Sequence, residues 1–216
     1  MKFARRAFLS ATLGAALCVA LPATAQQLGT DYTLLSPPQP TENPAKIEVT
    51  EFFSYGCSHC AEFNPLLAAW AVRLAPDVSF RKVPVSFGRA AWMNIGKLYY
   101  TLEGMGDAAR LDADIFRAIH SERVNLFDER NQVAWLANKG VDTKKYSELF
   151  NSFGMMSKIK RADQMTQSYR IEGVPALVVD GKYLVAGKDF NDQLAIADKL
   201  IAKIRTEKLT KGAGKK

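Results

Sequence analysis

Residues 51–60 read EFFSYGCSHC and place two cysteines where a strand is expected to turn into a helix. Apolar residues alternate from Ile47 to Phe53, which predicts a strand, and a second strand is predicted from Val78 to Val85. Between them, residues 58–74 carry apolar side chains at helical spacing. Strand, helix and strand form a βαβ unit, whose two strands lie parallel. The cysteine pair is therefore expected at the first turn of the helix.

Cys57 is predicted to be the reactive thiol of this pair. A thiol at the first turn of a helix faces unpaired main-chain N–H groups and the positive end of the helix dipole, and both favour the thiolate. His59 can place a donor or a positive charge near the same sulfur. Cys60 lies one turn further along the same face and is expected to be the buried, resolving thiol. Only a strongly acidic Cys57 makes such a pair an oxidant, because each pKa unit below ambient pH adds about 30 mV of oxidising power.

Two other interpretations of the motif are weaker. A structural disulfide between Cys57 and Cys60 would close a very short loop and would remove little chain entropy. A copper or zinc site built on these two cysteines and His59 lacks a fourth protein ligand, because the sequence has no second cysteine pair. Redox exchange is the favoured interpretation.

The middle of the chain is predicted to be helical throughout. From Arg89 to about Arg161 the apolar residues recur at helical spacing, with no strand-like alternation between them. The expected helix ends are marked by two N-caps and two stops, which are Asp128, Asp142, Gly140 and Gly154.

Strand-like sequence returns after a helix predicted from Met155 to Tyr169. Two short strands, Ala176–Val179 and Lys182–Ala186, flank a tight hairpin turn at Asp180-Gly181. A last amphipathic helix follows, and residues 26–46 are interpreted as an extended lead-in. The predicted class is α/β, with a small sheet domain interrupted by a helical domain.

The first 25 residues have the features of a secretory signal peptide. An apolar run from Ala11 to Leu21 follows basic residues and precedes the small-x-small site Ala23-Thr24-Ala25, so the mature chain is expected to begin at Gln26. The run is shorter than the roughly 20 residues of a membrane span. The Arg5-Arg6 pair also resembles a twin-arginine signal, which leaves the export route open. Cleavage removes Cys18 and leaves a single cysteine pair in a compartment where disulfides persist.

The formal net charge of +7 could indicate a nucleic-acid partner, but most of the excess charge lies at the two ends of the chain. Three basic residues belong to the predicted signal peptide, and residues 203–216 carry six basic residues against one acidic residue. The rest of the chain is close to neutral, and the C-terminal segment is interpreted as a frayed basic tail. We therefore expect no nucleic-acid partner.

The stretch at residues 51–60, the motif Gly173-Val174-Pro175-Ala176 and the helical insert between them resemble the DsbA family. The resemblance implies a thioredoxin fold interrupted by a helical insertion domain. It divides the mature chain into a first thioredoxin-like part at 26–87, the insertion at 88–161 and a second thioredoxin-like part at 162–216.

The resemblance also implies an activity and its partners. The expected activity is that of a periplasmic thiol:disulfide oxidase, a monomer that introduces disulfide bonds into unfolded or newly exported proteins through its redox-active disulfide. It would use no bound cofactor and would be reoxidised by a DsbB-type, quinone-linked membrane protein. A disulfide isomerase or reductase is the alternative within redox chemistry, although such isomerases usually add a dimerisation domain, for which residues 26–46 leave no room. A periplasmic metal-binding module is the alternative outside it.

Further site residues are expected around the pair. The resemblance implies a cis Val174–Pro175 bond lying against the cysteines, where the Val174 main chain would pair with an extended substrate. Glu51 and Lys82 share strand parity with apolar residues, so they are expected to form a buried pair under the site that tunes Cys57 or shuttles its proton. The alternative for both is a solvated strand end.

Two further polar residues are Ser58 in the motif and His120 in the insertion. Ser58 stands where well-known family members have proline, and its hydroxyl can bond the Cys57 thiolate, which affects the potential more than the reaction. His120, in the insertion, is assigned to the surface or to packing.

Overall fold

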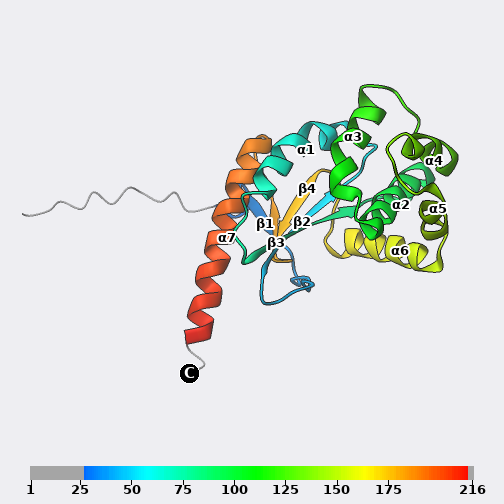
Figure 1. The fold of residues 1–216 in the computed structure, drawn as a ribbon. Coiled ribbons are helices and arrows are strands. Elements are labelled where there is room, and N and C mark those ends of the chain that lie inside the picture. Colours follow the sequence, from blue (N-terminus) through cyan, green and yellow to red (C-terminus); the bar gives the residue numbers. More distant parts are fainter. Residues whose placement is uncertain (1–26, 214–216) are drawn as a thin grey trace, which may run out of the picture.

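The computed structural model describes residues 27–213, and side chains up to residue 210 (Figure 1). The predicted signal peptide, its cleavage site at Gln26, and Lys215 and Lys216 lie outside the described residues. The described chain forms a five-stranded sheet in the order β1-β5-β4-β2-β3. Within this part of the chain, no helix combines the length and the apolar composition that crossing a membrane requires.

The predicted βαβ unit is confirmed. It consists of β2 (Ile47–Phe53), α1 (Ser58–Ala71) and β3 (Val78–Pro84), and the two strands pair in parallel. Every residue of β2 is buried, because the strand lies inside the sheet between β3 and β4. Helix α1 ends at Ala71, three residues before the predicted end at residue 74.

The sheet continues from β2 through an antiparallel hairpin. Strand β4 (Ala176–Val179) pairs with β2 and with β5 (Tyr183–Val185). The predicted turn is confirmed, because Asp180 and Gly181 both have positive φ, at 53° and 60°. A Cβ atom at Gly181 would lie 2.1 Å from the main-chain oxygen of Gln39, so the position requires glycine.

The lead-in contains a strand that the sequence did not predict. Strand β1 (Tyr32–Leu34) pairs antiparallel with β5 and forms one edge of the sheet. It has three residues in a segment without alternation, and its partner lies about 150 positions later. Tyr32 packs edge-to-face on Tyr183 at 5.1 Å, a contact that no local pattern indicates.

The insertion consists of helices gathered to one side of the sheet (Figure 1). They are α2 (Ala90–Met105), α3 (Ala108–His120), α4 (Glu129–Ala137), α5 (Thr143–Phe150) and α6 (Phe153–Ser168).

The predicted N-caps are confirmed, because the side chains of Asp128 and Asp142 accept hydrogen bonds from main-chain N–H groups of the next turn. Gly140 has a φ of 72° just after α4, as a stop requires. The predicted stop at Gly154 is wrong: Ser152 caps α6, so Gly154 lies in its first turn. Helix α6 runs unbroken across the expected domain boundary between residues 161 and 162.

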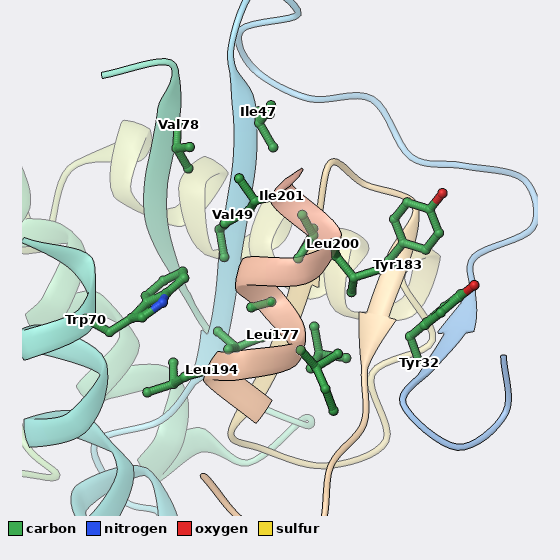
Figure 2. Close-up of a cluster of buried hydrophobic side chains, with 14 of the residues drawn as sticks. Tyr32, Ile47, Val49, Trp70, Val78, Leu177, Tyr183, Leu194, Leu200 and Ile201 are labelled. Carbon is green, nitrogen blue, oxygen red and sulfur yellow. The ribbon is translucent and has the colours of Figure 1, made fainter. Parts of the chain in front are cut away.

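Helices α1 and α7 (Phe190–Ala213) cover one face of the sheet and enclose a hydrophobic core (Figure 2). Ile47 and Val49 of β2 pack there with Trp70 of α1 and Leu200 of α7. A second core, around Phe53 and the insertion helices, lies at the other end of β2. The segment that carries Cys57 leaves the sheet at this second core.

The C-terminal segment is not the frayed tail that its charge suggested. Helix α7 continues to Ala213, and several of its cations have partners in the thioredoxin-like part. Arg205 pairs with Asp77 at 2.6 Å, and Lys208 donates to the Lys46 main-chain oxygen at 2.8 Å and to Asp180 at 3.1 Å. These partners come from loops distant in sequence, so charge along the sequence did not reveal them.

Candidate active site

Cys57 occupies the N-cap of α1, with extended backbone angles of φ −97° and ψ 121°. The pKa of its thiol is lowered to about 6, chiefly by a hydrogen bond from the Cys60 thiol. Partial burial opposes this shift, whereas the main-chain N–H groups of Cys60 and His59, and the charge of His59, favour it. These N–H groups belong to the first turn of α1, so the helix N-terminus lowers the pKa of Cys57, as the sequence predicts.

Cys60 has the opposite environment one turn further on. It is fully buried, and its pKa is raised far above the usual range by the hydrogen bond to Cys57 and by burial. Both sulfurs are free thiols. Near neutral pH, the site therefore holds an accessible thiolate at Cys57 and a buried thiol at Cys60.

The two residues between the cysteines face outward. The His59 side chain is 70% exposed, and its Nδ1 atom lies 3.2 Å from the Glu62 carboxylate. Ser58 is exposed as well. Within residues 27–213 its hydroxyl makes no hydrogen bond to Cys57, so the bond considered from the sequence is not present.

The loop before β4 lies against the cysteine pair. The Val174–Pro175 bond is cis, as the resemblance implies, and Cys57 Sγ lies 3.3 Å from the main-chain oxygen of Val174. Val174 packs in the same core cluster as Cys57 and Cys60. The contact joins two motifs that are 117 positions apart in the sequence into one site.

Glu51 and Lys82 form a buried pair rather than two solvated strand ends. They are direct neighbours in the parallel register of β2 and β3, and Lys82 Nζ lies 3.3 Å from Glu51 Oε2. Glu51 is fully buried, and only 12% of the Lys82 side chain is exposed. Burial raises the pKa of Glu51 to about 7, against the lowering effect of Lys82.

Sequence reasoning missed two further partners of Lys82. Its ammonium donates to both carboxylate oxygens of Asp112, at 3.1 and 3.0 Å, and to Asn64 at 3.2 Å. The Tyr55 hydroxyl donates to Asp112 at 2.8 Å. A signal was available: Asp112 lies four residues before Phe116, on the apolar face of α3, just as Glu51 interrupts the apolar face of its strand.

His120 also touches the segment that leads into the motif. Its Nε2 atom lies 2.8 Å from the Tyr55 main-chain oxygen, and its ring stacks on Phe116. Asp112, Phe116 and His120 are spaced four residues apart along α3, and all three contact Tyr55. The insertion therefore holds the chain two residues before Cys57, a role that the assignment of His120 to surface or packing did not include.

The metal-site interpretation finds no support in the described residues. Within residues 27–213 no group of three or more His, Cys, Asp or Glu side chains is arranged to hold a metal ion. His59 faces solvent, whereas Cys60 is buried. The side chains of Cys57, His59 and Cys60 therefore do not converge on one point.

A thioredoxin-like sheet with an acidic cysteine at a helix N-terminus, a buried second cysteine and a facing cis-proline defines a thiol:disulfide oxidoreductase. A sequence model of the DSBA-like thioredoxin domain matches residues 48–197. The chain belongs to the DsbA family.

Curated relatives agree with this assignment over nearly the whole chain. The thiol:disulfide interchange protein DsbA of Bordetella parapertussis is 38% identical over 201 residues, which cover 91% of this chain and 95% of the relative. The protein of the same name from Pseudomonas aeruginosa PAO1 is 36% identical over 206 residues, with 93% and 97% covered.

Solved structures show the same fold. The crystal structure of Pseudomonas aeruginosa DsbA superposes with a TM-score of 0.79 at 37% identity and covers 87% of this chain and 96% of its own. The oxidoreductase DsbA from Xylella fastidiosa has a TM-score of 0.79 at 33% identity, with 84% and 98% covered. The thioredoxin fold with a helical insertion, predicted from the resemblance, is confirmed.

Proposed function

We propose that this oxidoreductase works as an oxidase, which donates a Cys57–Cys60 disulfide to newly exported proteins in the periplasm. The observation that carries the proposal is the contrast between the two thiols: the pKa of Cys57 is lowered to about 6, and that of Cys60 is raised. A thiolate at Cys57 stabilises the reduced form, so the disulfide form accepts electrons more readily. A pKa one unit below neutral adds about 30 mV of oxidising power, and membership of the DsbA family favours an oxidase over a reductase or isomerase.

The exchange proceeds in two balanced steps. A substrate thiolate attacks Cys57 Sγ, the Cys57–Cys60 bond breaks, and Cys60 leaves with the electron pair and takes up a proton. A second substrate thiolate then attacks the substrate sulfur of the mixed disulfide, and Cys57 leaves as a thiolate. The substrate loses two electrons and gains a disulfide, while the enzyme becomes a dithiol. Cys57 suits the second step because a more acidic thiol leaves faster.

The substrate would bind along the loop that faces the cysteines. The Val174 main chain lies beside Cys57, and Pro175 has no N–H of its own to occupy the approach. An extended peptide can therefore place its cysteine at Cys57 while its main chain pairs with Val174, as in strand addition. Ser58 and His59, both exposed, would lie under the same peptide.

The remaining parts of the proposal come from the sequence and from family membership. The signal peptide predicted at residues 1–25 would deliver the protein to the periplasm. The protein would act as a monomer without a bound cofactor. A DsbB-type, quinone-linked membrane protein would reoxidise the Cys57–Cys60 dithiol by the reverse exchange.

The redox potential of the pair tests the direction of the reaction. The mature protein would be equilibrated with glutathione buffers, and the reduced fraction would be measured by thiol labelling. We expect a potential nearer to about −120 mV, the value of the strongly oxidising DsbA, than to about −270 mV, that of thioredoxin. A value close to thioredoxin's would overturn the oxidase assignment and leave only the oxidoreductase class.

A further inference from the structure

Four elements bring four polar groups together beneath the cysteine pair. Lys82 of β3 contacts Glu51 of β2 at 3.3 Å, Asn64 of α1 at 3.2 Å and both oxygens of Asp112 of α3 at 3.0 and 3.1 Å. Two carboxyl groups thus share one ammonium in a largely buried place, where charge is costly. If both acids were ionised, the cluster would carry an uncompensated negative charge.

We propose that Asp112 is a positioning residue of the redox site, which draws the Lys82 ammonium away from exclusive pairing with Glu51 and so keeps a proton on Glu51 near neutral pH. The residue stands on the insertion domain, whereas Glu51 and Lys82 stand on the sheet. The insertion would therefore supply part of the charge balance of the redox centre. The consequence for catalysis rests on the roles proposed above for Cys57 and Cys60.

The geometry assigns the shared proton to Glu51. Asp112 has two hydrogen bonds from Lys82 and a third from the Tyr55 hydroxyl, and its side chain is 17% exposed. Glu51 is fully buried, and neither of its oxygens has a hydrogen-bond partner of good geometry within the described residues. A carboxylate with donors and some solvent ionises more readily than a carboxylate with neither.

The direction of the Glu51 shift agrees with this assignment. Its pKa is raised to about 7 mainly by burial, and the charge of Asp112 raises it further, while Lys82 lowers it. The other titratable or charged groups that line the adjoining cavity or interact with the cluster are Tyr55, Cys60, Arg81, Tyr99 and Glu103. Burial keeps the pKa of Tyr55 and that of Tyr99 well above neutral, so these two phenols remain protonated.

A carboxyl group that titrates near neutral pH can both give and take a proton during exchange. Cys60 takes up a proton when it leaves Cys57 and gives one up when the disulfide reforms. The charge of Glu51 is among the causes that raise the pKa of Cys60, after its hydrogen bond to Cys57 and its burial. Glu51 and Cys60 are therefore electrostatically coupled. By holding Glu51 close to half-protonation, Asp112 would make this transfer effective in both directions.

Water can reach the side of the cluster that Asp112 occupies. A cavity of about 550 Å³ is lined by residues of α1, β3, α2 and α3, including Asn64, Lys82 and Asp112. Glu51 is not among the lining residues. Solvent therefore stabilises the charge on Asp112 but not the charge on Glu51, which again places the proton on Glu51.

The test measures Glu51 itself. The mature protein with carbon-13-labelled glutamate carboxyl groups would be titrated by NMR, with Glu51→Gln used to assign the signal. We expect a midpoint near 7 in the wild-type protein and a midpoint at least one unit lower in Asp112→Asn, because Lys82 would then pair with Glu51 alone. Asp114→Asn is the matched control: Asp114 lies on the same helix but pairs with Lys139 and Arg117.

Two outcomes would overturn the inference. One is an unchanged Glu51 midpoint in Asp112→Asn; the other is a wild-type midpoint near the ordinary glutamate value, which needs no variant to fold. Asp112→Glu, which keeps the charge, should restore a midpoint close to that of the wild type. The measurement uses no substrate and no partner, so it is independent of whether the protein oxidises or reduces.

A kinetic readout connects the shift to the reaction. The rate at which Cys60 displaces a small thiol from Cys57 would be followed against pH. We expect the profile of Asp112→Asn to move to lower pH than that of the wild type or Asp114→Asn. In a Glu51→Gln background, Asp112→Asn should no longer move the profile. A shift of equal size in both backgrounds would show that Asp112 acts by another route.

Discussion

The sulfur of Cys57 lies 3.3 Å from the main-chain oxygen of Val174, although 117 positions separate the two residues. Below the Cys57 pKa of about 6, the thiol can donate its proton to this oxygen. The thiolate and the disulfide form have no proton to donate there, so the Val174 oxygen is free to accept an N–H group from a substrate chain. One contact thus joins the reacting sulfur to the surface proposed for the peptide.

Replacing each sulfur in turn separates their roles. Cys57→Ser should abolish disulfide exchange, because it removes the accessible thiolate. Cys60→Ser should accumulate mixed disulfides, since no buried thiol remains to expel a partner bound to Cys57. Mass spectrometry under non-reducing conditions would detect these adducts. If Cys60→Ser collects none while Cys57→Ser does, the roles assigned to the two sulfurs are reversed.

The thiolate absorbance of the reduced protein should titrate with a midpoint of about 6. The folded pKa of Cys57 is below its unfolded value, so this group stabilises the reduced fold increasingly as pH rises from about 6 to 9, and that contribution is lost as pH falls through 6. Urea unfolding of reduced wild-type protein and of Cys57→Ser at several pH values measures the difference. A thiolate midpoint near 9 would contradict the prediction.

Glu51→Gln should stabilise the protein at neutral and alkaline pH. The folded pKa of Glu51 is raised from 4.5 to about 7, so ionisation opposes folding, and stability falls as pH rises from about 4.5 to 7 and then levels off. The variant removes this loss and should gain roughly 2–3 kcal/mol at pH 8, with little gain at pH 4. Lys82 keeps Asp112 as its partner in the variant. A destabilised variant at pH 8 would show that the Glu51 charge is needed to balance Lys82.

Gly56→Ala should destabilise the protein and slow disulfide exchange. A Cβ atom at Gly56 would lie 2.9 Å from Trp92 Nε1 and 3.1 Å from atoms of Ile95 and Phe127, so the insertion would have to move or displace Cys57. Overpacking of this kind costs about 1–3 kcal/mol.

Gly154→Ala is the matched control for this substitution. Gly154 lies in the first turn of α6, and the nearest atom to a Cβ there would be Ser152 Oγ, 3.9 Å away. The variant should leave exchange unchanged and stability equal or slightly higher. Thermal unfolding and insulin reduction would compare the two variants. Equal stability and equal activity in both would contradict the close packing of Gly56.

The parts of the site that depend on near neighbours could be predicted from the sequence. Cys57 lies at a helix N-terminus because a strand and a helix adjoin there, and Glu51 faces Lys82 because strand parity places each on the apolar face. The nearness of Val174 to Cys57 was expected only from the family resemblance. The parity argument did not extend to Asp112, although a charge on the apolar face of a helix is the same kind of signal.

Local sequence patterns are enough to predict the βαβ unit and which sulfur stands at the end of the helix, because these follow from side chains within a few positions of one another. Apart from the Glu51–Lys82 pair, the contacts between charged groups depend on how whole elements pack. In the folded protein the basic C-terminal segment is a helix that forms salt bridges with Asp77 and Asp180. Helix α3 packs so that Asp112 accepts hydrogen bonds from Lys82 and Tyr55. Such contacts join residues that are distant in sequence. They form only when whole elements pack, and the spacing of apolar residues along the sequence does not predict them.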